Sequence, residues 1–71
     1  MAKRKDGKLS PELSSEIIKE MGGFTETAKV FRVTPQAIMH LGKTGFTWIQ
    51  VEFLRFRYPH LASVRKTYDE F

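Results

Sequence analysis

The first third of the chain spaces its apolar residues as an amphipathic helix does. Between residues 10 and 21 they recur at intervals of three and four, a period typical of one buried helical face. These positions are Leu13, Ile17, Ile18 and Met21. Ser10 and Pro11 supply a capping hydroxyl and a proline at the first helical position, so they predict where the helix begins. The pair Gly22-Gly23 predicts its end.

A second, shorter helix is predicted from Phe24 to Phe31. Within it, Phe24, Ala28 and Phe31 are three and four residues apart and fall on one face. The pair Arg32-Val33 predicts the next break in helical structure.

A third helix is predicted to follow from Thr34. A residue before proline is disfavoured in the helical conformation, so Thr34 stands just outside the helix, where its hydroxyl caps the free amides. The expected buried side consists of Ala37, Ile38 and Leu41. Gly42 and Gly45 flank the turn that closes this helix.

The segment from Phe46 to Tyr58 carries apolar residues on nearly all sides. Thr47 and Gln50 match a capping box, while Phe46 and Val51 match a hydrophobic staple, so a helix is predicted to run to Tyr58, before Pro59. Its aromatic and β-branched content also suits a strand, which is the alternative.

As a helix, this segment must be buried on more than one side. We expect its large aromatic residues, Trp48, Phe53 and Phe56, in the core, and a dimer contact or a protein partner on another side. Arg55 and Arg57 point to opposite sides and are expected to be solvated. After Pro59, the spacing of Leu61, Val64 and Tyr68 permits a final helical stretch.

The elements together predict a mainly α fold, a small helical bundle of four to five helices that contains a helix-turn-helix. The alternative is an α+β domain with one C-terminal strand. A chain of 71 residues is long enough for a single core.

Charge is concentrated at the start of the chain. Residues 1–8 hold Lys3, Arg4, Lys5 and Lys8 against Asp6, which is +3 of the net charge of +4. With one apolar residue besides Met1 and no periodicity, residues 1–8 are predicted to be a disordered basic arm that contacts phosphate or an acidic partner. Order is expected to begin at Ser10, within a single domain over residues 9–71.

Several classes of protein are disfavoured by composition. The chain has no cysteine, and His40 and His60 lack ligand-spaced partners, so neither a metal nor another cofactor is predicted. The longest apolar runs fall far short of a membrane span, and we expect a cytoplasmic protein. Without a glycine-rich phosphate loop, a nucleophile beside a base or a paired-carboxylate pocket, we expect a protein that is not an enzyme.

A short helix, a tight turn and a second short helix form the helix-turn-helix pattern. The run from Gly23 to Ile38, GFTETAKVFRVTPQAI, resembles the helix-turn-helix of Cro-type and related phage or prophage repressors. Gly45-Phe46 followed by Tyr58-Pro59 is similar to the ending of that family's domain. The resemblance covers about residues 22 to 61.

The resemblance implies a DNA-binding surface on the third helix. The residues that it places toward the major groove are Thr34, Pro35, Gln36, Met39, His40 and Lys43. It assigns the packing between the two helices to Ala28, Val33, Ile38 and Leu41. Gln36 is the best candidate for reading a base, because a side-chain amide pairs bidentately with adenine.

The segment departs from the family pattern at two places. Where the family usually has a small polar residue and then an aromatic followed by a base, this chain has Met39, His40, Leu41 and Gly42. Two expected phosphate or base contacts are therefore missing. Arg32 stands where the turn commonly has glycine, which predicts either positive φ at an arginine or a rebuilt turn.

Two functions follow from these observations. The first is a phage-type transcription regulator, working as a possible homodimer, that binds double-stranded DNA through residues 34–43. Because the body outside residues 1–8 is almost neutral, the alternative is a helix-turn-helix-like phage protein that binds host RNA polymerase through the basic arm, the first helix and the apolar fourth segment.

Overall fold

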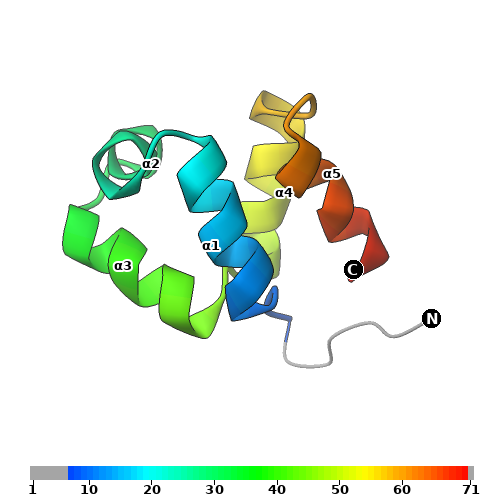
Figure 1. The fold of residues 1–71 in the computed structure, drawn as a ribbon, viewed down its shortest axis with the longest axis horizontal. Coiled ribbons are helices and arrows are strands. Elements are labelled where there is room, and N and C mark those ends of the chain that lie inside the picture. Colours follow the sequence, from blue (N-terminus) through cyan, green and yellow to red (C-terminus); the bar gives the residue numbers. More distant parts are fainter. Residues whose placement is uncertain (1–6, 71) are drawn as a thin grey trace.

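The computed structural model describes residues 7–70, and within that range it is helical with no strand (Figure 1). Its elements are α1 (Pro11–Glu20), α2 (Phe24–Phe31), α3 (Pro35–Thr44), α4 (Trp48–Arg57), α5 (Ala62–Lys66) and a 3-10 turn, η1 (Thr67–Asp69). The predicted helical bundle is confirmed, and the α+β alternative is wrong.

Helix α1 occupies the middle of the molecule. Ser10 Oγ accepts a hydrogen bond from the backbone N–H of Leu13 at 3.3 Å, and Pro11 takes the first helical position, as predicted. Gly22 and Gly23 then turn the chain with φ of 110° and 103°. In Figure 1, α2 and α3 lie on one side of α1 while α4 and α5 lie on the other, and α1 packs against both α3 and α5.

The core draws apolar side chains from every α-helix. Its buried members are Leu9, Leu13, Ile17, Ile18, Ala28, Ile38, Phe46, Val51, Leu54 and Val64. Two residues expected inside are instead exposed, Phe24 by 43% and Val33 by 44%. Phe24 is the first residue of α2, and Val33 lies in the turn between α2 and α3. Val33 is therefore not the buried side chain between these two helices that was expected.

Helix α4 begins with the predicted capping box. Thr47 Oγ1 accepts from the backbone N–H of Gln50 at 3.4 Å, and Gln50 Oε1 accepts from the backbone N–H of Thr47 at 2.8 Å. Two amides that would otherwise lack a partner at the helix start are thereby satisfied. This local pairing favours the helix over the strand that the aromatic and β-branched residues also allowed.

Only one side of α4 reaches the core. Val51 and Leu54 are fully buried, whereas Ile49 and Phe56 are 74% and 83% exposed, and Trp48 is half exposed. The expectation that Trp48 and Phe56 belong to the core is therefore wrong. No segment within residues 7–70 covers the side of α4 that faces away from the core, so a set of apolar side chains stays in water.

Arg55 is not the solvated charge that the sequence suggested. Its Nε donates to Thr67 Oγ1 at 2.9 Å, and its guanidinium carbon lies 3.9 Å from the ring centroid of Tyr68. Its Nη1 is also 3.2 Å from a carboxylate oxygen of Glu52. These contacts tie α4 to η1, which explains why a charged side chain faces the interior.

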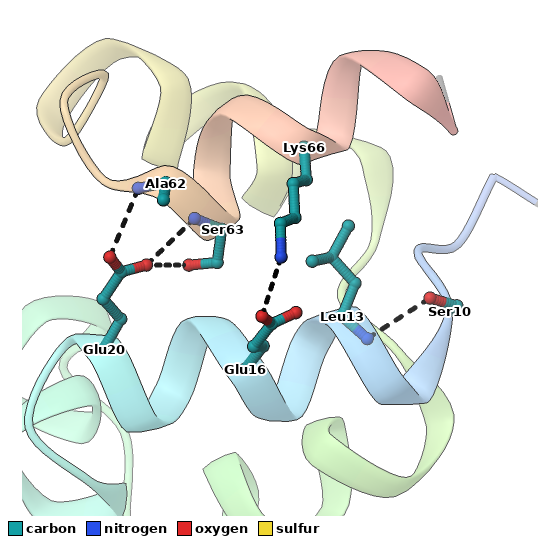
Figure 2. Close-up of polar contacts among 7 residues, drawn as sticks. All are labelled: Ser10, Leu13, Glu16, Glu20, Ala62, Ser63 and Lys66. Carbon is teal, nitrogen blue, oxygen red and sulfur yellow. Dashed lines mark hydrogen bonds and ion pairs between the residues drawn. The ribbon is translucent and has the colours of Figure 1, made fainter.

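Two carboxylates of α1 hold α5 in place (Figure 2). Glu20 accepts hydrogen bonds from the N–H of Ala62 at 3.2 Å, and from both the N–H and the hydroxyl of Ser63. Glu16 lies 2.9 Å from Lys66 Nζ. The Ser63 hydroxyl and amide lower the pKa of Glu20 below its usual value, and the Glu16 carboxylate raises the pKa of Lys66.

The folded body begins before Ser10, where order was expected to start. Leu9 is fully buried, and its N–H donates to the carbonyl of Phe46 at 2.8 Å. The N–H of Trp48 donates to the carbonyl of Gly7 at 2.8 Å. The predicted arm therefore has its last two residues, 7 and 8, bound by backbone contacts to the segment between α3 and α4.

Candidate nucleic-acid interface

The turn between α2 and α3 has one of the two geometries that its unusual arginine allowed. Arg32 adopts the left-handed conformation, with φ 59° and ψ 45°. The N–H of Val33 donates to the carbonyl of Ala28 at 3.0 Å, which closes the end of α2. A side chain at this position costs roughly 1 kcal/mol or more relative to glycine. The turn has therefore not been rebuilt to spare the arginine.

The start of α3 is fixed by its own first residues. Thr34 Oγ1 accepts from the backbone N–H of Ala37 at 3.2 Å, and Pro35 follows at the first helical position. Both Thr34 and Pro35 are exposed. The predicted cap is confirmed, and it leaves this end of α3 open to solvent.

Four of the predicted contact residues form one continuous stripe along α3. They are Gln36, Met39, His40 and Lys43, at positions i, i+3, i+4 and i+7, and all are exposed. We call them the α3 stripe. Among residues 7–70, the side chains of Gln36, His40 and Lys43 have no hydrogen-bond or ion-pair partner. Their polar groups are therefore available to a ligand.

The opposite side of α3 packs against the rest of the bundle. Ile38 is fully buried, and Ser15 Oγ of α1 donates to the carbonyl of Gly42 at 3.2 Å. A Cβ atom at Gly42 would lie 3.3 Å from Ile18 Cδ1. Gly42 therefore faces α1 and not solvent, and its lack of a side chain allows the two helices to approach closely.

The polypeptide around the α3 stripe is basic. Residues 27–51 include Lys29, Arg32 and Lys43 but no aspartate or glutamate. Lys29 is paired with Glu26 at 3.5 Å in an exposed contact. Two acidic residues of α1, Glu16 and Glu20, lie instead toward α5, where they contact Lys66 and Ser63. This separation gives the α2–α3 side a positive local charge although the whole domain is close to neutral.

The predicted phosphate contacts outside α3 are placed only in part. Lys8 is exposed and its backbone forms a bridge with Thr47, just beyond the C-terminal end of α3. The other three, Lys3, Arg4 and Lys5, lie outside the described residues. The base of the basic segment is thus next to the last turn of α3.

A groove between α2 and α4 was not foreseen from the sequence. It has a volume of about 440 Å³, and its apolar walls are Val30, Phe31, Ile49 and Phe53. Two arginines, Arg32 and Arg57, complete its lining together with Gln50. The apolar excess of the segment from Phe46 to Tyr58 was the available signal, but it does not reveal which side of the helix stays exposed.

Two features are absent from the part of the chain that the structure describes. Within residues 7–70, no group of three histidine, cysteine or acidic side chains is arranged to hold a metal ion. No helix in that range has the length and apolar character needed to cross a membrane.

No family model, curated protein or solved structure matches this chain.

Proposed function

We propose that this protein regulates transcription in a bacterial cytoplasm by binding double-stranded DNA, with the α3 stripe in the major groove. The observation that carries the proposal is the stripe itself, four exposed side chains, three of them with unused polar groups, on a helix that a buried face holds against the bundle. The basic, acid-free stretch from residue 27 to residue 51 supports it, because phosphates repel acidic side chains.

Each contact residue has a distinct role in this proposal. Gln36 pairs its amide with an adenine edge, and Lys43 binds a phosphate or a guanine edge. Met39 and His40 lie between them and contact base edges, with the methionine suited to a thymine methyl group. Thr34 and Pro35, at the start of the helix, approach the DNA backbone. The basic side chains of residues 1–8 add phosphate contacts.

Two copies of the chain would act together on a palindromic operator. Helix-turn-helix dimers bind half-sites about one helical turn apart, so two-fold symmetry in the DNA reflects symmetry in the protein. Trp48 and Phe56, exposed apolar side chains of α4 that do not line the groove, provide surface that a second copy would cover.

The test is fluorescence anisotropy of a labelled random duplex, titrated with protein from about 50 to 200 mM salt. We expect binding that weakens steeply with salt. Lys43→Ala should weaken it for every sequence and lower the salt slope by about 1. Gln36→Ala should leave random-duplex binding unchanged and weaken binding to a selected operator by about 1 to 3 kcal/mol.

Arg65→Ala is the matched control, because Arg65 is an exposed base on α5, far along the chain from the α3 stripe. Arg65→Ala should change neither random-duplex binding nor operator binding by more than the small, general effect of removing one positive charge. Absence of binding at the lowest salt would contradict the proposal, and so would equal effects of Arg65→Ala and Lys43→Ala.

Binding to a host RNA polymerase subunit is the second candidate function. The exposed apolar side of α4 favours a protein partner, since a soluble domain rarely leaves such side chains in water without use. Helix α1 contributes little to this alternative, because Leu13, Ile17 and Ile18 are buried in the domain's own core.

A further inference from the structure

The groove between α2 and α4 combines an apolar lining with two positive charges, and the guanidinium carbon of one of them, Arg57, lies 5.9 Å from the ring centroid of Phe53. Phe31 and Phe53 stand with ring centroids 5.4 Å apart, and Ile49 extends the apolar surface while remaining largely exposed. Arg32 and Arg57 line the same groove and take part in none of the ion pairs found within residues 7–70.

The two arginines of the groove differ from the cations of the folded body that lie near carboxylates. Where other cations of the folded body lie near carboxylates, pairs form, as at Lys29, Arg55 and Lys66. No aspartate or glutamate lines this groove. No described residue supplies a carboxylate to these two guanidinium groups, and they suit the carboxylates of a ligand, because arginine is the side chain best suited to bidentate carboxylate binding.

We propose that this groove binds an acidic peptide segment of another protein, one that places a leucine or phenylalanine side chain beside two carboxylates. The apolar side chain enters between Phe53 and Ile49, and the carboxylates meet Arg32 and Arg57. The volume of about 440 Å³ is large enough for one such side chain with part of its backbone. This site does not depend on DNA binding by α3.

Charge and polarity also disfavour two other occupants. A second copy of the chain that covered the groove symmetrically would bring both pairs of arginines together, and like charges at close range oppose association. A DNA backbone would satisfy the guanidiniums, but its hydrated phosphates gain nothing from the apolar walls of Phe31, Ile49 and Phe53.

The experiment uses the full chain and a short fluorescein-labelled peptide in which leucine and phenylalanine alternate with pairs of aspartates. We expect saturable binding to the wild type. Two control peptides replace either the aspartates with lysine or the apolar residues with serine. Neither should bind comparably, because the groove requires both charge and apolar contact.

Two variants test the place of binding, each with a matched control. Arg57→Gln should weaken peptide binding roughly threefold to tenfold, whereas Arg65→Gln, which removes a charge from α5, should leave it nearly unchanged. Ile49→Ser should weaken binding by about tenfold or more, whereas Phe56→Ser, a change at an exposed residue of α4 outside the groove, should not.

Several results would overturn the proposal. They are no binding of the acidic peptide, equal binding of the lysine peptide, and equal effects of Ile49→Ser and Phe56→Ser.

Self-association abolished by Ile49→Ser, in sedimentation without peptide, would assign the groove to a second copy. Loss of duplex DNA binding in Arg57→Gln but not Arg65→Gln would assign it to DNA. Unchanged DNA binding in both groove variants would separate this site from the α3 stripe.

Discussion

The α1–α5 contact and the exposed sides of α3 and α4 use their side chains in opposite ways. Between α1 and α5, carboxylates meet donors directly, as Glu20 does at Ser63 and Glu16 does at Lys66. On the exposed sides of α3 and α4, the side chains of Gln36 and Lys43 have no partner in the described chain, and Ile49 of α4 is largely exposed to solvent. The α1–α5 contact holds the fold together, whereas the exposed sides of α3 and α4 leave polar groups and apolar surface available to a ligand. Substitutions in the two should therefore separate stability from binding.

The largest expected effect compares two isoleucines that differ in burial. Ile17→Ala removes a fully buried side chain from α1 and should lower the free energy of unfolding by about 2 to 5 kcal/mol. Ile49→Ala, at the exposed position on α4, should change it by less than about 0.5 kcal/mol. Urea denaturation followed by far-ultraviolet circular dichroism measures both. Similar losses of unfolding free energy in the two variants would mean that the buried and the exposed position contribute alike to stability.

The next effect concerns Glu20 and pH. Because its donors at Ser63 lower the pKa of Glu20 in the folded protein, the stabilisation is complete above the unfolded-state pKa and is lost as pH falls through the folded-state pKa. Glu20→Gln should reduce stability at neutral pH and flatten its decline in acid. Glu12→Gln, at an exposed glutamate of α1, is the control and should keep the wild-type decline. An unchanged acid profile in Glu20→Gln would contradict the role given to Ser63.

A smaller effect of opposite sign is expected at Arg32. Glycine adopts φ near 59° without the clash that an arginine side chain meets. Arg32→Gly should therefore stabilise the protein by about 0.5 to 1 kcal/mol, after the greater freedom of glycine in the unfolded chain is subtracted. Thermal denaturation at fixed pH checks this, with Arg65→Gly as a control that should destabilise α5. A destabilised Arg32→Gly would show that the arginine side chain has a stabilising contact.

The smallest effects on stability are expected along the α3 stripe. Gln36→Ala and Lys43→Ala each replace an exposed residue without an internal partner, so the free energy of unfolding should change by no more than about 0.5 kcal/mol. Chemical denaturation of both variants provides the measurement. A large loss of stability in either would mean that reduced DNA binding could not be attributed to a lost contact.

Local sequence signals predicted the helix boundaries well. Ser10, Thr34 and Thr47 each precede a helix and accept a hydrogen bond from the backbone N–H three residues later. Such caps depend on residues that are neighbours along the chain, so the pattern that forms them is visible in the sequence. The outward position of the α3 stripe was implied by the resemblance to the phage-repressor helix-turn-helix.

Burial on α4 and the contacts between distant helices could not be predicted in this way. A helix with apolar groups all round does not indicate which side meets the core, and for that reason Trp48 and Phe56 were misplaced. Ser63, which donates to Glu20, lies 43 residues away along the chain, and Thr67, which accepts from Arg55, lies 12 residues away. Pairings at such separations arise from the three-dimensional arrangement of helices and leave no local signature.

The contact between Ser10 and Glu70 has a consequence for how the domain folds. The N–H and hydroxyl of Ser10 donate to the two carboxylate oxygens of Glu70, at 2.9 and 2.7 Å, across a separation of 60 residues. Glu70 therefore completes the start of the first helix from the far end of the described chain. During synthesis this contact must wait until residue 70 has left the ribosome, so closure of the domain is a late and long-range event, unlike the rapid formation of its individual helices.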